Sequence, residues 1–441
     1  MHNPTTDRLG PMRERARAAL ERDDVAAAER DFSRLLEAAP DDAEALQFLA
    51  ARHLSRGDAG RAVEMLGSVS RAQPGNASVW YQLGSAQMAG GDFAAAADSL
   101  QRGLDRVPQM FVARLRLGIS LQQLGRGDEA LVAYFSAINS AQAQGRWLSD
   151  ETTPPGMRDA VKFAMNHVDA GRHNLFDAVL EPLRQRHGAG ALERVEHALA
   201  IYLGEKPLNL PDARQKPKFL YFPDIPSQTY YAQDRFPWHR ELEAATDTIR
   251  GELCEVLQQQ ADKLEPFLGT HEPEALYTHL SSSGDEDARW DAFFFYRHGN
   301  RYDTHCERCP QTIGLLDSTP LVRIRDHGPE ALFSVLRPGT HILPHRGVTN
   351  TRLVTHLPLI VPSDCAIKVG GEDHVWQEGQ CVTFDDTFEH EAWNDSDQTR
   401  VVLIVDDWNP DLTEVEQHAV SDLVAAIGDF NRACEVPETA G

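Results

Sequence analysis

The pattern of hydrophobic and polar positions divides the chain into two parts with different periods. Residues 12–140 repeat every 34 residues, which is the length of one helix pair with its turns. Glycines that end a first helix and prolines that follow a second helix explain much of this period. The repeated positions are Leu49, Leu83 and Leu117; Gly57, Gly91 and Gly125; Ala62, Ala96 and Ala130; and Pro40, Pro74 and Pro108. The pattern predicts an N-terminal α-solenoid.

A short motif inside this region indicates the type of repeat. The segment Trp80-Tyr81-Gln82-Leu83-Gly84 fits W-x-x-L-G, so residues 12–140 resemble three to four tetratricopeptide repeats. Such repeats serve as a scaffold or offer a concave surface to a peptide or protein partner. Residues 141–205 continue the helical pattern without a clear repeat and are predicted to be capping helices. Residues 206–216 are polar, contain proline and are predicted to be a linker.

From residue 217 the pattern changes to short strands. Apolar or alternating runs are broken by Gly, Pro, Asn and Asp, as in residues 354–362, 366–384 and 389–406. Histidine and arginine stand at positions where an ordinary sandwich core would carry Val or Leu. This combination predicts a small β-barrel with a polar interior that holds a metal. A T-x-x-E capping box predicts the start of a final helix near the C-terminus. The strands and their flanking helices are together predicted to form one domain over residues 217–435.

Composition and charge exclude several classes of partner. The chain has 441 residues and a net charge of −24, which disfavours binding to nucleic acid or to an anionic membrane surface. We expect no membrane span, because no run approaches roughly 18 apolar residues, and the first residues lack the apolar core of a secretory signal. Six cysteines are few for this length and favour reduced thiols. We therefore expect a cytoplasmic protein.

Two histidines in the strand-rich part are the best candidates for metal ligands. His345 follows Pro344 at the end of a predicted strand, and His390 begins another. Two neutral imidazoles brought together suit a borderline divalent metal. The position two residues after the first histidine, where iron oxygenases often carry a carboxylate, is Gly347. Asp386 lies four residues before His390 and could reach the metal only through a bulge or turn, so we expect a two-histidine site completed by solvent.

Arginine and further histidine side chains are predicted to surround this pair. If residues 394–398 form a hairpin turn, Ala392 pairs with Arg400 and His390 with Val402, so all four side chains share one face. Arg400 would then lie roughly 6–7 Å along the strand from the metal ligand, a spacing that suits a five-carbon diacid.

The strand at residues 352–357 predicts a polar cavity on one of its faces. Alternation places Arg352, Val354 and His356 on that face and Leu353 and Leu357 on the other. Cys306 and Cys309 could seed a zinc site, but no second pair follows, so structural thiols are favoured over a redox-sensitive pair.

Four segments of this part resemble one enzyme family. They are FSVLRPGTHILPHRGVTNTRL, WQEG, FDDTFEHEAWN and TRVVLIVD, and over residues 217–410 the chain resembles the aspartyl/asparaginyl β-hydroxylases. The resemblance implies a double-stranded β-helix (jelly-roll or cupin-like) fold and a dioxygenase that uses Fe(II), 2-oxoglutarate and O2. It implies that His345 and His390 bind iron without a carboxylate ligand. The cosubstrate-binding residues that it implies are Arg400, Ser334, His356, Trp290 and Arg352.

One departure from the family pattern affects the expected substrate. The family carries R-x-R-x-H where this chain has Arg352-Leu353-Val354-Thr355-His356, so Val354 replaces a second arginine. This puts part of the cosubstrate contact or the choice of an acidic side chain in doubt. From the resemblance and the repeats together, we expect a hydroxylase that acts on a protein or peptide side chain of the Asp/Asn type, with the repeats recruiting the substrate.

Three alternatives stay open at this point. The target could be a small molecule or a lipid acyl chain. The chain could also be a non-catalytic repeat adaptor whose barrel senses a metal or metabolite. A zinc hydrolase built on the same histidines is the weakest alternative, because no general base is evident.

Overall fold

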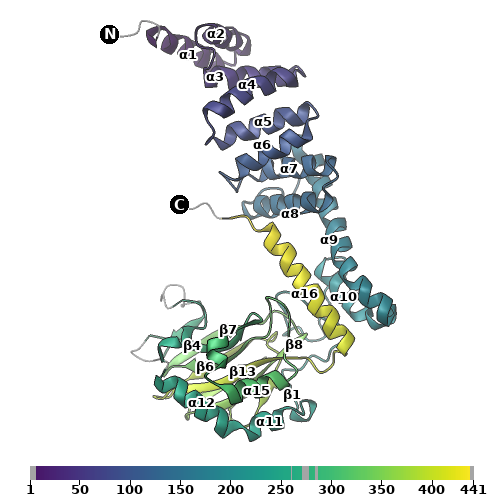
Figure 1. Ribbon diagram of the computed structural model, residues 1–441, viewed down its shortest axis with the longest axis vertical. Helices are drawn as coiled ribbons and strands as arrows, with labels where there is room; N and C mark the ends of the chain where they lie inside the picture. The colour runs from purple at the N-terminus through teal and green to yellow at the C-terminus, as the bar shows by residue number, and fades with distance from the viewer. Residues whose placement is uncertain (1–5, 260, 271–277, 284–286, 438–441) are drawn as a thin grey trace. The chain divides into compact units, whose positions relative to one another are not determined.

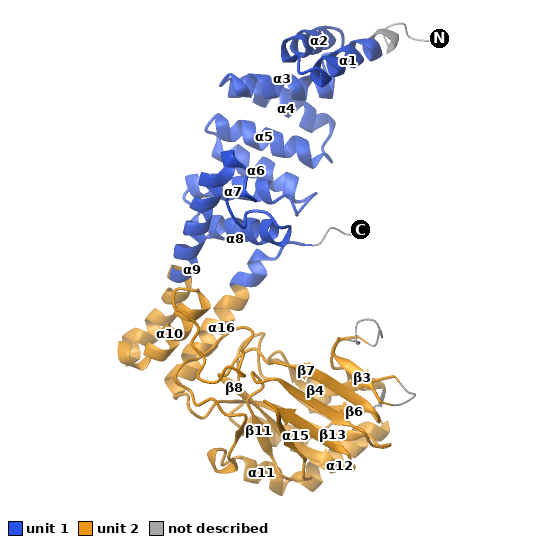
Figure 2. Ribbon diagram, turned by 180° about the vertical axis from the view of Figure 1, so that it is seen from behind, with its two compact units in different colours: residues 1–173, 430–441 blue, residues 174–429 orange. Residues whose placement is uncertain are grey.

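The computed structural model describes residues 6–259, 261–270, 278–283 and 287–437 (Figure 1). The other residues, which include 260, 271–277 and 284–286 of the predicted second domain, lie outside the described part. The chain forms two compact units, Met1–His173 with Phe430–Gly441, and Asn174–Asp429 (Figure 2). The division falls within two long helices, α9 (Arg158–His187) and α16 (Glu414–Cys434).

The first unit consists of antiparallel helix pairs. These are α1 (Thr6–Glu21), α2 (Val25–Ala38), α3 (Ala43–Ser55), α4 (Ala59–Ala72), α5 (Ala77–Ala89), α6 (Phe93–Leu104), α7 (Phe111–Gln123) and α8 (Gly127–Ala143). Each helix packs on the next one along the chain. Asp24, Asp58 and Asp92 cap α2, α4 and α6 by accepting a backbone N–H three residues later. The predicted helical repeat is confirmed.

The repeated glycines do what their spacing predicts. Gly57, Gly91 and Gly125 adopt φ values of 84°, 80° and 73°, the left-handed conformation that ends a helix at low cost for glycine. Gly84 lies against Leu100, and Gly118 lies against the Tyr134 ring. An added Cβ would come within 2.7 Å of the Leu100 side chain or 2.6 Å of the tyrosine ring, so these two glycines set the spacing of their helix pairs.

The second unit is built on two sheets. Its helices include α10 (Glu193–Tyr202), α11 (His239–Ala244), α12 (Thr246–Gln259), α14 (Asp303–Cys306) and α15 (Pro310–Ser318). The strands are β1 (Tyr230–Tyr231), β2 (Glu265–Pro266), β3 (Leu280–Ser282), β4 (Trp290–Arg297), β5 (Asn300–Arg301), β6 (Ala331–Leu336), β7 (Thr340–His345), β8 (Arg352–Ile360), β9 (Cys365–Val369), β10 (Glu372–His374), β11 (Val382–Phe384), β12 (His390–Asn394) and β13 (Arg400–Trp408).

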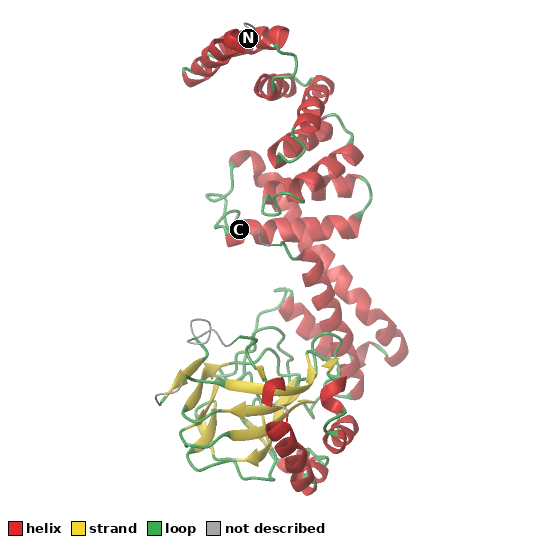
Figure 3. Cartoon of the chain, turned by 60° about the vertical axis from the view of Figure 1, so that its left-hand side comes forward, coloured by secondary structure: helices red, strands yellow, loops and turns green. Residues whose placement is uncertain are grey.

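Strand order defines a large and a small sheet, shown among the yellow strands of Figure 3. The large sheet runs β1-β11-β8-β13-β6-β4-β2 with β5 beside β4, and the small one runs β10-β9-β12-β7-β3. Neighbouring strands are antiparallel throughout. The sheet-rich C-terminal domain that the sequence predicts is therefore present.

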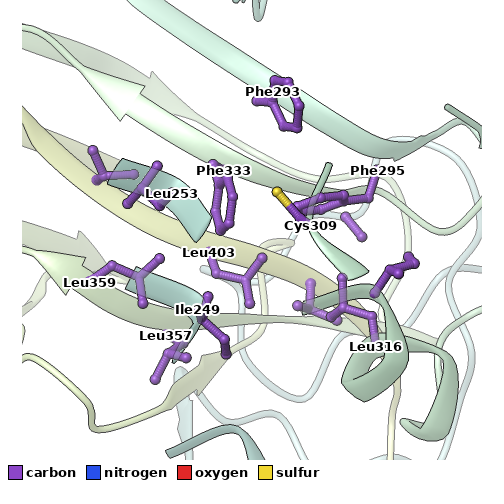
Figure 4. Packing of buried hydrophobic residues seen from close by; sticks show 14 of the residues in the cluster. Ile249, Leu253, Phe293, Phe295, Cys309, Leu316, Phe333, Leu357, Leu359 and Leu403 are labelled. Atoms are coloured by element: carbon purple, nitrogen blue, oxygen red, sulfur yellow. The ribbon is translucent and has the colours of Figure 1, made fainter. Parts of the chain in front are cut away.

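The two faces of the large sheet are covered differently: helices pack on the outer face, and the inner face borders a cavity. On the outer face, Phe293, Phe333, Leu403 and Leu357 form one row across β4, β6, β13 and β8. Figure 4 shows this row with side chains of α12 and α15, which cover it. All four side chains of the Phe293–Tyr296 run are buried. A second cluster of buried side chains lies between the sheets, around the cavity described below.

The predicted hairpin at residues 394–398 is wrong. Strand β12 pairs with β7 and β9 in the small sheet, whereas β13 pairs with β6 and β8 in the large sheet. The Asn394 side chain makes the corner between them: its Nδ2 donates to the carbonyls of Leu336 and Gln398, and its Oδ1 accepts from Ser396. Alternating hydrophobicity identifies a strand but not its partner, so sequence symmetry about Ser396 gave a false pairing.

Candidate active site

A cavity of about 150 Å³ lies between the two sheets of the second unit. All seven site residues predicted from the sequence line it. The lining is Phe267, Trp290, Glu330, Leu332, Ser334, Ile342, His345, Arg352, Val354, His356, Ile367, Phe384, Asp386, His390, Ala392, Arg400, Ile404 and Asp406. The predicted alternation of β8 is also confirmed, since Arg352, Val354 and His356 face this cavity while Leu357 enters the outer core.

A β-bulge brings the two candidate ligands together. Ala392 of β12 pairs with Ile342 of β7, but two residues earlier His390 pairs with His345, three residues farther along β7. The extra residue in β7 turns the His345 side chain onto the inner face, where an uninterrupted strand would have placed Pro344. The imidazole centroids of His345 and His390 lie 4.0 Å apart.

Both imidazoles present an unprotonated Nε2 to the cavity. The Nδ1 atoms lie 2.9 Å from the carbonyl of Leu343 and 3.1 Å from that of Phe388. A carbonyl only accepts, so each Nδ1 carries the hydrogen and each Nε2 keeps its lone pair. Burial lowers the pKa of His345 and of His390 to about 4, so both rings are neutral at pH 7. Two neutral imidazole nitrogens form a donor set that fits a divalent transition metal.

Asp386 occupies the space beside Gly347. A Cβ on Gly347 would lie 2.1 Å from the Asp386 carboxylate carbon, and the Gly347 N–H donates to the Asp386 carbonyl at 2.6 Å. Burial raises the pKa of Asp386, and its Oδ1 has no hydrogen-bond partner in the described structure. The turn before His390 therefore brings this carboxylate to the cavity, although no set of three or more His, Cys, Asp or Glu side chains among the described residues could hold a metal ion.

Arg352 binds two carboxylates of the protein itself. Its Nη1 lies 2.6 Å from Asp406 Oδ1, and its Nη2 lies 3.2 Å from Asp386 Oδ2. Burial raises the pKa of Asp406 to about 6, while the two carboxylates raise the pKa of Arg352 against the opposing effect of burial. The guanidinium therefore fixes the Asp386 side chain next to the histidine pair.

Arg400 is a buried cation with no carboxylate at hydrogen-bond distance in the described structure. Its side chain is 1% exposed, its Nη1 lies 3.4 Å from Ser334 Oγ, and its Nε has no partner there. The guanidinium stacks over Trp376, 4.8 Å from the ring centroid. Burial lowers the pKa of Arg400 to about 10, so it stays charged at pH 7. A buried charge without a counter-ion is costly, and this geometry suits an anionic ligand group.

Ser334 and Trp290 complete the environment of Arg400. The Trp290 Nε1–H donates to Ser334 Oγ at 2.9 Å, and its ring stacks on Phe267 at 3.8 Å between centroids. Because Ser334 Oγ accepts from both Trp290 and Arg400, its own hydrogen is left as a donor for a ligand. Ser334 is fully buried, so that donor faces the cavity and not bulk solvent.

His356 lies between the arginine and the histidine pair. It is buried, and its Nδ1 has no hydrogen-bond partner in the described structure. Burial and the Arg400 charge lower the pKa of His356 well below its ordinary value, so the ring is neutral. Polar atoms of Arg400, His356 and Asp386 that have no partner among the described residues thus belong to the lining of one small cavity, which is the pattern of a built ligand site.

Sequence reasoning missed some members of this site. Trp376, Phe267, Asp406 and Glu330 were not singled out, although Trp376 stands in the WQEG segment that carried the resemblance. The pairing of Asp406 with Arg352 joins residues 54 positions apart and leaves no local signal. Only the register of β8 against β13 reveals it.

Other candidates lie away from the cavity. Cys306 and Cys309 are buried free thiols, and burial raises the pKa of both, as befits structural residues. His341, a histidine of β7 four residues before His345, lies 2.8 Å from Glu391 and does not line the cavity. Among the described helices, none is both long and apolar enough to cross a membrane.

Comparison with known proteins matches both parts of the chain to families. Residues 243–410 match the family model described as Aspartyl/Asparaginyl beta-hydroxylase. Residues 49–111 and 81–145 match the tetratricopeptide repeat model. Both resemblances predicted from the sequence are confirmed.

Three curated relatives show the range of this similarity. Aspartate beta-hydroxylase domain-containing protein 2 of Mus musculus is 31% identical over 54% of this chain and 66% of that protein. Aspartyl/asparaginyl beta-hydroxylase of Homo sapiens is 38% identical over 31% of this chain and 18% of that protein. Ornithine lipid ester-linked acyl 2-hydroxylase of Rhizobium tropici is 37% identical over 40% of this chain and 59% of that protein. The chain spans less than two thirds of each.

Proposed function

We propose, from the premise that residues 243–410 form a domain of the aspartyl/asparaginyl β-hydroxylase family, that this chain is an Fe(II)- and 2-oxoglutarate-dependent hydroxylase. Its substrate would be a protein or peptide side chain, and the tetratricopeptide repeats would recruit the partner that carries it. The bound iron would supply the redox chemistry that uses O2 and 2-oxoglutarate to convert a C–H bond into C–OH, with succinate and CO2 as the other products.

Each cavity residue has a distinct task in this proposal. The Nε2 atoms of His345 and His390 would hold the iron. Arg400 and Ser334 would bind the distal carboxylate of 2-oxoglutarate through the donors that they leave unused. His356 would lie beside the metal-binding end of the cosubstrate, and Trp290 would form a wall of its pocket and hold Ser334 in place.

Asp386 and Arg352 take supporting roles in this proposal. Asp386 would orient a solvent ligand at the position that Gly347 leaves without a side chain. Arg352, which the sequence resemblance placed among the cosubstrate-binding residues, would instead position Asp386, because both of its terminal nitrogens already face protein carboxylates.

The fold supports this assignment. The orders β6-β13-β8-β11 and β7-β12-β9-β10 divide eight successive strands equally between two sheets, and this division supports a double-stranded β-helix of the jelly-roll or cupin type. The observation that carries the proposal is more local: two neutral imidazoles share a cavity with a buried guanidinium that has no carboxylate partner in the described structure. An iron and a keto-diacid would satisfy both.

Turnover of 2-oxoglutarate tests the proposal. Purified full-length protein is incubated with Fe(II), ascorbate and 2-oxoglutarate, and succinate is measured with His345→Ala as the matched control. Succinate from the wild type and none from the variant is the expected result. Neither turnover nor binding of 2-oxoglutarate with Mn(II) in place of iron would favour the non-catalytic adaptor, and activity that is independent of O2 would favour a hydrolase.

One comparison favours a second candidate substrate. The relative from Rhizobium tropici is named for the hydroxylation of a lipid acyl group, and it matches 179 residues of this chain. Mass spectrometry of host proteins and lipids, with and without the enzyme, would locate the added oxygen. Oxygen on a protein side chain supports the proposal, whereas oxygen on an acyl chain supports this alternative.

A further inference from the structure

The arginines of the cavity lining are not available to an acidic substrate. In the described lining the arginines are Arg352 and Arg400. On the proposed function, on which this inference rests, Arg400 faces the 2-oxoglutarate carboxylate. Arg352 is held by Asp406 at 2.6 Å and Asp386 at 3.2 Å, so a third carboxylate would have to displace one of them.

Two further cations near the cavity, Lys218 and Arg346, lie outside its lining. Lys218 is exposed and outside the lining, and its backbone N–H donates to the Gly347 carbonyl at 3.2 Å, next to the histidine pair. Arg346 is half-buried, pairs with Glu389 at 3.0 Å and is likewise outside the lining. Within the described lining, an acidic side chain would therefore have to rely on Arg352, which the protein's own carboxylates hold, or on Arg400, which faces the cosubstrate.

The wall beside Arg352 has the wrong charge for a carboxylate. Val354 faces the cavity and lies directly across from Asp406 on β13 and from Phe384 on β11. Glu330 lines the same cavity, and its Oε1 accepts the His298 N–H at 2.7 Å. A carboxylate placed over Val354 would meet the carboxylates of Asp406 and Glu330, whose basic partners Arg352 and His298 already face them, and the described lining offers no further cation there, an arrangement that disfavours binding.

The neighbouring lining is apolar. Ile404 lies between His356 and Leu332 in one row across three strands, and the Phe267–Trp290 stack forms another wall. We infer that the substrate side chain that enters beside the histidine pair is uncharged, so that an asparagine or a leucine is accepted and an aspartate is rejected.

Paramagnetic NMR tests this preference without turnover. The full chain is loaded with Mn(II) and 2-oxoglutarate, and line broadening is measured for N-acetyl-N-methylamides of leucine, asparagine and aspartate. Asparagine and aspartate have the same shape and differ in charge. We expect affinity for leucine and asparagine to exceed that for aspartate by about tenfold or more. Equal or stronger broadening of aspartate, or no broadening of any probe, overturns the inference.

Substitution of Val354 gives a second readout. Val354→Arg should raise affinity for the aspartate probe about tenfold relative to Val354→Met, a control of similar length without charge. If Val354→Arg binds 2-oxoglutarate and does not gain aspartate binding, the inference is overturned. If Val354→Arg no longer binds 2-oxoglutarate, the inference is judged by the broadening of the three amide probes on the wild-type protein alone.

The same samples separate the failure of this inference from failure of the proposed function. If Mn(II) does not broaden 2-oxoglutarate in the wild type, the proposed function fails and this inference fails with it. If 2-oxoglutarate binds and aspartate is preferred, only the inference fails. Stronger broadening of hexanamide than of all three amino-acid probes would overturn the assignment to a protein side chain.

Discussion

Gly347 and Asp386 share one small volume: a Cβ on the glycine would lie 2.1 Å from both the carboxylate carbon and Oδ1 of the aspartate. The residue two positions after His345 therefore has to be a glycine, because the carboxylate reaches this place from another segment. Arg352 holds that carboxylate from the opposite side through its Nη2 at 3.2 Å from Oδ2. The cavity thus keeps an acidic group beside the histidine pair although the local sequence lacks one.

Gly347→Ala should destabilise the second unit and weaken the proposed metal binding. The added methyl group displaces Asp386, and overpacking of this kind costs about 1–3 kcal/mol. The free energy of unfolding in urea and Mn(II) binding by calorimetry measure the two effects. Gly347→Ala combined with Asp386→Ala should recover part of the lost stability, because the clash disappears. If the losses of unfolding free energy from Gly347→Ala and Asp386→Ala simply add in the double variant, the proposed clash between the new methyl group and the carboxylate is wrong.

Arg400→Met should stabilise the ligand-free protein and abolish binding of the diacid. The substitution removes a buried charge with no counter-ion in the described structure, a change worth about 1–3 kcal/mol in the free energy of unfolding. It also removes the proposed partner of 2-oxoglutarate. Arg352→Met is the matched control and should cost about 3–5 kcal/mol, because it leaves Asp386 and Asp406 unpaired. Equal losses of unfolding free energy in Arg400→Met and Arg352→Met would refute the assignment of Arg400 as unpaired and Arg352 as paired in the ligand-free protein.

A prediction on pH rests on His239. This ring stacks on Phe236, lies 3.2 Å from Thr383 Oγ1, and burial lowers its pKa to about 4. Between the unfolded value of about 6.5 and about 4 the unfolded chain binds the extra proton. Stability therefore falls as pH drops through this window and levels off below it.

The comparison of two variants isolates this contribution. In His239→Phe, the loss of unfolding free energy between pH 6.5 and 4 should be smaller than in the wild type by about 1–3 kcal/mol. The exposed His418→Gln should match the wild-type pH dependence. Urea titrations at five or six pH values measure the slopes, and a wild-type slope in His239→Phe would reject the explanation.

The local sequence pattern was enough to predict the repeat helices and to predict which side chains of β8 line the cavity. The period of 34 residues specified the helix pairs, because each glycine and proline acts within its own repeat. The alternation along β8 specified that Arg352 and His356 face one side. These properties depend only on neighbours in the sequence.

Properties that depend on strand pairing could not be predicted. His345 reaches His390 only because of the bulge in β7, which no residue pattern announces. After the corner at Asn394, β13 joins the large sheet, so the predicted hairpin with β12 is absent. Arg400 nevertheless lines the cavity. The ion pairs of Arg352 with Asp386 and Asp406 also join segments far apart in the sequence, so no local pattern predicts them.

The spacing of the repeat helices makes a last prediction. A Cβ on Gly118 would lie 2.6 Å from Cδ1 and Cε1 of Tyr134, a ring buried between α7 and α8. Gly118→Ala should therefore lower local stability by about 1–3 kcal/mol, since neither the ring nor the backbone can move away cheaply. Hydrogen exchange of α7 and α8 peptides reports this change within the first unit.

The matched control for this variant is a helical glycine with room for a methyl group. Gly67 lies inside α4, and the nearest atom to its added Cβ is the end of the Arg71 side chain at 3.5 Å. Gly67→Ala should slow hydrogen exchange, because alanine in a helix interior is favoured over glycine by about 0.5–1 kcal/mol. Opposite effects of one methyl group at two helical glycines would show that close packing on Tyr134 and not helix propensity selects Gly118. Faster exchange in both variants would instead indicate that the repeats tolerate no change at either glycine.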